Sequence, residues 1–141
     1  MKNIVERQIM WGDLDALGIV FYPRYYEWID ACGHLFFDAV GLNMNQLWKE
    51  RNIVFGLKKT SCQYFQAGRY HQKIRIYTCI EALDRETLVL QHDIRAAKDD
   101  GRMVLGMEKR ICMDVSHPSG LKAMAIPADL FAILDQAREP E

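Results

Sequence analysis

The sequence lacks most of the features that would place it in a specialised class of protein. No apolar run is long enough to cross a bilayer, and the stretch from Met1 to Arg7 carries charge before any apolar segment, so we expect neither a membrane span nor a signal peptide. The formal net charge is −1 and no basic block occurs, which leaves nucleic-acid binding without electrostatic support. With no repeat, linker or low-complexity segment, residues 1–141 are expected to form a single domain.

Common catalytic and cofactor motifs are missing as well. There is no GxGxxG or P-loop sequence, no GxSxG nucleophile elbow and no HExxH zinc motif. Glu27, Asp30 and His34 have a metal-like spacing along one helix face, but no Cys/His cluster accompanies them, so we interpret them as a polar stripe and expect no metal. His92, on an alternating strand, is interpreted as a packing residue with satisfied hydrogen bonds.

The four cysteines form no CxxC pair and are widely spaced, at positions 32, 62, 79 and 112. We interpret them as reduced, mostly buried thiols, which predicts a cytoplasmic protein. None has a local signature of a nucleophile. An even number of cysteines is also compatible with disulfides, an alternative that the absence of an export signal disfavours.

A clear change of hydrophobic period follows Pro23. Apolar residues recur from there at spacings of three and four, which predicts a long helix with a broad apolar face. That face comprises Tyr25, Trp28, Ile29, Cys32, Leu35, Phe36 and Ala39. Proline suits the first turn of a helix, and Gly41 is a suitable C-terminal stop. So broad a face predicts a helix wrapped by other structure.

The rest of the chain is expected to be mostly strands. A first strand is predicted at 3–11, and a period of two predicts the others at 53–66, 72–82, 87–97 and 102–115. The last of these alternates Met103, Leu105, Met107 and Ile111 against Glu108, Arg110 and Asp114. Short helices are expected at 43–51 and 127–134. Because short turns connect most strands, the sheet should be antiparallel, and it must bury the long helix. The predicted fold class is α+β, a curved five-stranded sheet wrapping a central helix.

Two aspartates, Asp13 and Asp15, stand just before this helix in a largely apolar stretch. If Tyr22 is the N-cap, its backbone N–H lies outside the helix ladder, and Pro23 has none, so that amide is free to stabilise an oxyanion. One ionised aspartate opposite such a donor suffices for acyl transfer, either as nucleophile or as general base on water. Loop aspartates also commonly cap turns, which is the structural alternative for both.

The pattern Asp13-x-Asp15-x-x-Gly18-x-Val20-x-Tyr22-x-x-Tyr25 resembles the signature of hotdog-fold acyl-CoA thioesterases. Residues 18–31 look especially like the 4-hydroxybenzoyl-CoA thioesterase branch. The resemblance implies the hotdog fold, with homodimers or homotetramers whose active sites lie at subunit interfaces. It also implies an acyl-CoA as small-molecule substrate and no cofactor beyond the CoA of that substrate.

The same resemblance implies roles for individual residues. Asp15 would be the catalytic carboxylate, and Tyr22 would contribute its backbone N–H to the thioester carbonyl. Substrate-binding roles fall to Gly18, Tyr25, Asp30 and Thr78, and CoA-binding roles to Arg85 and Lys122. Asp30 would lie near the acyl group, hydrogen-bonded to a substrate hydroxyl or to a tyrosine. Asp13 is left to order the turn.

We therefore expect a thioester hydrolase that acts on an aromatic or medium-sized acyl-CoA. One alternative is a related enzyme acting on acyl groups held by acyl-carrier protein, which would favour a basic surface around the entrance to the site. The other alternative is a non-catalytic acyl-CoA-binding protein, which would bind without turnover.

Overall fold

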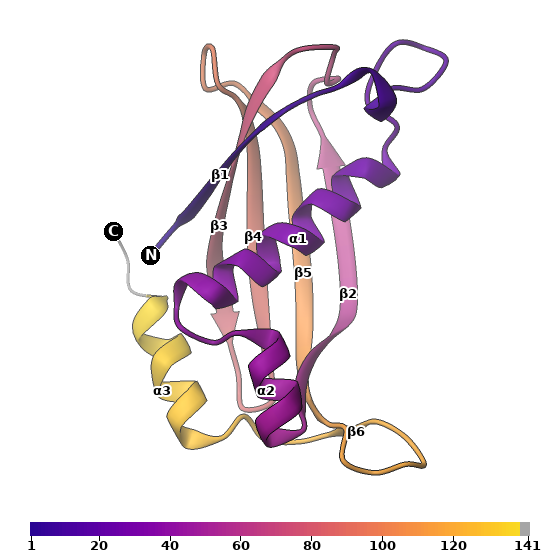
Figure 1. Ribbon diagram of the computed structural model, residues 1–141. Coiled ribbons are helices and arrows are strands. Elements are labelled where there is room, and N and C mark those ends of the chain that lie inside the picture. Colours follow the sequence, from indigo (N-terminus) through magenta and orange to yellow (C-terminus); the bar gives the residue numbers. More distant parts are fainter. Residues whose placement is uncertain (139–141) are drawn as a thin grey trace.

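A curved antiparallel sheet with one long helix across its face makes up the computed structural model, which describes residues 1–138 (Figure 1). The strands are β1 (Asn3–Gln8), β2 (Ile53–Tyr64), β3 (Lys73–Leu83), β4 (Thr87–Ala96), β5 (Arg102–Asp114) and β6 (Lys122–Ala123). Their order is β1-β3-β4-β5-β2, with β6 paired to β5. The helices are α1 (Pro23–Ala39), α2 (Met44–Arg51) and α3 (Ala128–Ala137), with a 3₁₀ turn at Trp11–Asp13. The predicted hotdog arrangement, a central helix in a sheet with five long strands, is confirmed.

Three local features differ from the prediction. Strand β1 ends at Gln8, because Asp13 Oδ2 accepts a hydrogen bond of 2.9 Å from Met10 N and the chain turns there. The two-residue strand β6 is too short to leave a periodic pattern. Alternation along β2 is interrupted by an irregularity between Leu57 and Lys59, where the ladder shifts its register.

Helix α1 begins and ends where the sequence predicts. Tyr22 is the N-cap and Pro23 the first helical residue. Gly41, with a φ of 84°, donates its N–H to Asp38 O at the C-terminal end. The prediction of the apolar face was wrong at two positions, Leu35 and Ala39, which are exposed. Phe37 is buried in their place, because the last turns of α1 pack on β2, with the Phe37 and Phe55 rings 5.1 Å apart.

Two apolar clusters lie between α1 and the sheet, one under each half of the helix. The cluster under the N-terminal half includes Tyr25, Trp28, Ile29, Ile74, Ile76, Ile94 and Met103. The cluster under the C-terminal half also contacts α2 and α3 and includes Phe36, Phe37, Phe55, Leu88, Leu90 and Leu134. On β3 and β4 the residues between the two clusters are Thr78 and His92, both fully buried.

A row of polar side chains, four of them buried, crosses the sheet at this boundary and ends at α1. Thr78 Oγ1 lies 2.8 Å from His92 Nδ1, and His92 Nε2 lies 2.9 Å from Glu108 Oε1. Arg110 then donates to Glu108 Oε2 at 2.8 Å and, from the same nitrogen, to Asp30 Oδ1 of α1 at 2.8 Å. We call these five residues the polar row. Both nitrogens of His92 are bonded, as expected for a packing histidine.

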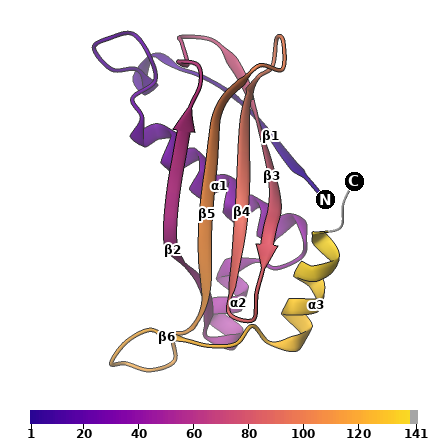
Figure 2. The ribbon, with the colours of Figure 1, turned by 180° about the vertical axis from the view of Figure 1, so that it is seen from behind.

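Strand β5 therefore turns Glu108 and Arg110 toward the helix. Glu108 and Arg110 are buried, whereas Leu105, Met107 and Ile111 lie half-buried on the other face. No helix of the described residues covers that outer face (Figure 2). Gly33 allows α1 to lie close to the charged pair, because a Cβ there would be 2.6 Å from Glu108 Oε1.

No helix within residues 1–138 is long and apolar enough to span a membrane. The same part of the chain contains no group of three or more His, Cys, Asp or Glu side chains arranged to hold a metal ion.

Candidate active site

Hydrogen bonds of Asp13 hold together the two ends of the segment between β1 and α1. Besides Met10 N, Asp13 uses its own carbonyl, which accepts from Phe21 N at 2.8 Å. Leu14 and Val20 form an antiparallel bridge just above. Asp13 thus orders the turn, as expected, and the segment that follows is a closed loop delivered to the start of α1.

Asp15 is held within that loop. Its Oδ1 accepts from Leu17 N at 2.8 Å, and its backbone bonds to Ile19 O and Gly18 N close the loop around it. Gly18 has a φ of 77°, a conformation that favours glycine. The Asp15 side chain is half-buried, and one carboxylate oxygen is left without a hydrogen-bond donor among residues 1–138. It can therefore accept a further donor such as water.

Tyr22 supplies a free backbone amide at the positive end of α1. Among residues 1–138 no acceptor is hydrogen-bonded to its N–H, and Pro23 has no N–H to compete. The next bonds of the turn run from Arg24 N to Phe21 O and from Tyr25 N to Tyr22 O. An amide in this position stabilises negative charge on an oxygen placed near it.

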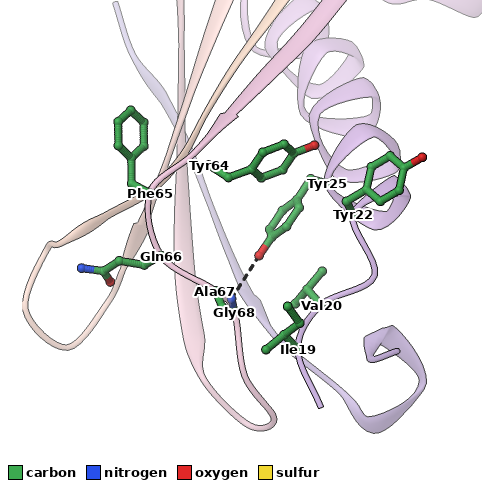
Figure 3. A pocket seen from close by; sticks show the side chains of 9 residues that line it. All are labelled: Ile19, Val20, Tyr22, Tyr25, Tyr64, Phe65, Gln66, Ala67 and Gly68. Atoms are coloured by element: carbon green, nitrogen blue, oxygen red, sulfur yellow. Dashed lines mark hydrogen bonds between the residues drawn. The ribbon is translucent and has the colours of Figure 1, made fainter. Parts of the chain in front are cut away.

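A pocket of about 470 Å³ opens beside this amide (Figure 3). It is lined by Ile19, Val20, Tyr22, Tyr25, Tyr64, Phe65, Gln66, Ala67 and Gly68. Figure 3 shows the Tyr25 ring reaching toward the 67–68 loop while the Tyr22 ring points away from it. The pocket thus has a largely aromatic and apolar wall, with the helix N-terminus at one side.

The hydroxyl of Tyr25 ties α1 to the opposite wall. It accepts a hydrogen bond of 3.2 Å from Gly68 N, and its ring packs edge-on against Trp28 at 5.3 Å. Burial raises the pKa of this phenol, and the bond from Gly68 only partly opposes that effect, so Tyr25 stays protonated at neutral pH. Gly68 has no room for a side chain, since a Cβ would lie 2.7 Å from Val20 Cγ2 and 2.8 Å from the Tyr25 hydroxyl.

Beyond the pocket, the β2-facing side of α1 carries a polar contact. Burial raises the pKa of the Cys62 thiol of β2 more than the neighbouring side chains of Tyr26 and Tyr64 lower it. The thiol is therefore protonated at neutral pH, which agrees with a packing role and not with a nucleophile.

The eight residues singled out from the sequence do not form one cluster within a single chain. Tyr22 and Tyr25 line the pocket; Asp15 and Gly18 belong to the adjoining loop, outside the lining. Asp30 lies farther along α1, bound to Arg110. The other three lie elsewhere in the fold: Thr78, Arg85 and Lys122.

Thr78 is fully buried and bonded to His92, and it does not line the pocket beside Tyr22. Arg85 follows β3, where its carbonyl accepts from Ile126 N. Lys122 belongs to β6, at the opposite end of the sheet from the 3₁₀ turn (Figure 1). The CoA-binding roles of Arg85 and Lys122 stay predictions.

The sequence analysis did not identify the wall formed by Tyr64, Phe65, Gln66, Ala67 and Gly68. Tyr64 ends β2 and the other four residues follow it, more than forty positions after the loop that they face. The sequence contains only a weak indication of this wall: an aromatic pair at the end of a strand, followed after Gln66 by two small residues.

Comparison with known proteins gives consistent matches. Residues 9–134 match the family model of the thioesterase-like superfamily. The 4-hydroxybenzoyl-CoA thioesterase of Pseudomonas sp. (strain CBS-3) is 29% identical over 134 residues, covering 92% of this chain and 94% of the relative.

Solved structures agree in fold along nearly the whole chain. A mutant of 4-hydroxybenzoyl-CoA thioesterase complexed with 4-hydroxybenzoyl-CoA superimposes with a TM-score of 0.86 at 26% identity, covering 94% of this chain and 98% of that one. A gentisyl-coenzyme A thioesterase superimposes with a TM-score of 0.78 at 28% identity, covering 89% and 97%.

The crowding at Gly68 yields a stability prediction. Gly68→Ala should lower the free energy of unfolding by about 1–3 kcal/mol, because the added methyl group displaces Val20 or the Tyr25 hydroxyl. Gly12→Ala is the matched control, since nothing lies within 4 Å of a Cβ there. Urea denaturation of both variants measures the difference, and equal losses would contradict the packing at Gly68.

Proposed function

The chain belongs to the thioesterase-like superfamily and is a thioester hydrolase, and we propose that it cleaves an aromatic acyl-CoA of the 4-hydroxybenzoyl-CoA type into the free acid and CoA. The observation that carries the proposal is the aromatic pocket of about 470 Å³ beside the free Tyr22 amide. Flat rings stack favourably on Tyr25, Tyr64 and Phe65, whereas a flexible alkyl chain loses more conformational freedom on binding. Two relatives of more than 25% identity are named for aromatic acyl-CoA substrates, which also supports this acyl class.

Hydrolysis would begin with the thioester carbonyl oxygen at the Tyr22 N–H. As the carbonyl carbon is attacked, negative charge develops on this oxygen, and the amide at the helix N-terminus stabilises it. Because no acceptor within residues 1–138 competes for that N–H, its hydrogen bond is available to the substrate without rearrangement. The thiolate of CoA leaves, takes up a proton, and the acid is released.

The Asp15 carboxylate would provide the attack. It acts either as nucleophile, forming an anhydride that water then cleaves, or as general base that takes a proton from the attacking water. The bond from Leu17 N holds one carboxylate oxygen and leaves the other available. Asp15 lies outside the lining of its own chain's pocket, which supports a site completed by a second subunit.

We accordingly propose a homodimer or homotetramer, acting in the cytoplasm. In one chain, Arg85 and Lys122 lie far from the pocket, and pairing of subunits is the way in which they would reach the CoA phosphates of a partner's site. Arginine and lysine bind phosphate groups strongly in partly exposed positions.

Asp30 would recognise a hydroxyl on the acyl ring. Tyr22, Tyr26 and Asp30 stand at intervals of four along α1 and share one face of the helix, which begins at the free amide. Asp30 is about 12 Å farther along the axis, from a rise of about 1.5 Å per residue. Its side chain is 50% exposed, so the carboxylate is accessible to a hydroxyl donor.

The acyl preference is tested with a panel of CoA thioesters: 4-hydroxybenzoyl-CoA, benzoyl-CoA, hexanoyl-CoA and octanoyl-CoA. We expect kcat/KM for the hydroxylated aromatic substrate to exceed that of the aliphatic ones at least about tenfold, because ring stacking and the Asp30 contact favour it. Release of free thiol measures each rate. Equal or faster turnover of the alkyl substrates would refute the aromatic preference.

The role of Asp15 is tested with Asp15→Asn. An amide keeps the bond to Leu17 N but is neither a base nor a comparable nucleophile, so kcat should fall by about 10²–10⁴. Asp99→Asn is the matched control, because Asp99 Oδ1 accepts from Gly101 N at 2.9 Å in the same turn geometry. Full activity of Asp15→Asn would exclude the proposed chemistry.

The oxyanion role of the Tyr22 amide is tested by two substitutions. Tyr22→Pro removes the N–H and suits the φ of −55° at this position, so kcat should fall by about 10²–10³ with the helix intact. Tyr22→Phe keeps the amide and should leave kcat nearly unchanged. Circular dichroism checks folding, and a kcat that falls only in Tyr22→Phe would assign the function to the phenol instead.

A further inference from the structure

In the polar row, an arginine lies behind the Asp30 carboxylate, and burying this arginine costs free energy of hydration. The exposed fractions of the Glu108 and Arg110 side chains are 1% and 4%, and His92 is fully buried. Buried charges lose their hydration, and apolar side chains of similar size would fill the same place more cheaply. Arg110 Nε adds to the cost, since it is buried and has no hydrogen-bond partner in the described part of the chain. Stability alone therefore does not account for this arrangement.

Arg110 is itself held in place by two contacts besides Asp30. Its NH1 donates to Phe55 O at 3.1 Å, and its NH2 donates to Glu108 Oε2 at 2.8 Å. Glu108 is fixed in turn by His92, whose other ring nitrogen bonds to Thr78. A neutral His92 that donates to Glu108 and accepts from Thr78 satisfies all these contacts. The guanidinium therefore has little freedom to move.

Among residues 1–138, Asp30 is the one exposed partner of this rigid group. Arg110 NH2 donates to Asp30 Oδ1 at 2.8 Å, while Oδ2 lies 3.8 Å from His34 Nδ1, beyond hydrogen-bond distance. One oxygen is thus fixed by the protein, and the other remains accessible on the side of α1 that carries Tyr22 and Tyr26. A functional group supported in this way is oriented before the ligand arrives.

We propose that Arg110 is a positioning residue that orients the Asp30 carboxylate toward the ring hydroxyl of the substrate, with Glu108, His92 and Thr78 fixing Arg110 in turn. The proposal rests on the proposed function, in which Asp30 accepts that hydroxyl. Arg110 does not touch the substrate; it selects the orientation of the residue that does. Its effect is therefore confined to substrates with a ring hydroxyl.

The kinetic test compares Arg110→Met with wild type on 4-hydroxybenzoyl-CoA and benzoyl-CoA. We expect KM to rise about tenfold for the hydroxylated substrate with kcat nearly unchanged, and neither constant to change much for benzoyl-CoA. In Asp30→Asn, adding Arg110→Met should cause no further rise in KM, since the two residues act as a unit. Equal losses on both substrates, or additive effects of the two substitutions, would overturn the proposal.

Two variants separate positioning from stability. Glu108→Gln combined with Arg110→Met removes both buried charges while keeping an acceptor for His92, so resistance to urea should recover relative to Arg110→Met alone, while the KM for 4-hydroxybenzoyl-CoA stays raised. Arg102→Met is the control: Arg102 pairs with Asp93 at 3.0 Å, outside the polar row, and its loss should leave both KM values unchanged. Recovery of KM together with stability would overturn the positioning role.

A crystal structure of Arg110→Met gives a readout that does not depend on turnover. The Asp30 carboxylate should leave its wild-type orientation while the backbone of α1 stays in place, and an unmoved carboxylate would overturn the proposal. If Asp30→Asn leaves the KM of both substrates unchanged, the substrate contact in the proposed function is wrong, and the crystal structure still decides whether Arg110 orients Asp30.

Discussion

The ion pair between Glu108 and Arg110 determines how α1 lies on the sheet. Breaking such a buried pair by removing one partner typically costs about 3–5 kcal/mol, because the remaining charge is stranded away from water. Rotating or sliding α1 would leave this pair intact within β5 but would separate Asp30 from Arg110, and a residue larger than Gly33 brought to the same place would meet Glu108. Apolar clusters on both sides hold the helix down, but apolar contact is non-directional and tolerates small shifts. The charged contact does not, and it therefore fixes the position of the helix and of the amide at its N-terminus.

The periodicity of the sequence was sufficient to predict the elements and their order, because each long strand and α1 carries its own apolar pattern. It was not sufficient to predict the face that β5 turns inward. Alternation shows that the two faces differ but not which one faces the helix, and Leu105, Met107 and Ile111 lie half-buried on the outer face. The inward face is decided by pairing with β4, which aligns Glu108 with Leu90 and Arg110 with Leu88, both in the core. Arg110 also donates to Asp30, 80 positions away, a contact that no local pattern reveals.

The candidate site also has one part that the local sequence predicts and another that depends on the folded sheet. The loop from Asp13 to Tyr22 is contiguous, and its turn chemistry is local: an aspartate that accepts from a nearby amide, a glycine with positive φ and a proline that starts a helix. Those features are readable in a sequence. The wall opposite depends on where β2 ends and on Gly68 fitting under the Tyr25 hydroxyl, which are consequences of the folded sheet. Local chemistry was predictable, whereas the shape of the space around it was not.

Helix α1 carries a free amide at its first turn and a fixed carboxylate about two turns later. Together these two groups define the length of ligand that can contact both. The amide is free because Tyr22 is the N-cap of α1, and Asp30 Oδ1 is held by Arg110, so neither group can shift to follow a shorter or longer ligand. The separation of about 12 Å along the axis is that of a rigid rod. In the proposed function, the thioester carbonyl binds the Tyr22 amide. A polar group on the acyl part can then reach the Asp30 carboxylate only if a rigid acyl group holds it at the matching distance. An alkyl chain has no such group and no such rigidity, so under the proposed function the spacing of the two groups along the helix would add to the selectivity of the aromatic pocket.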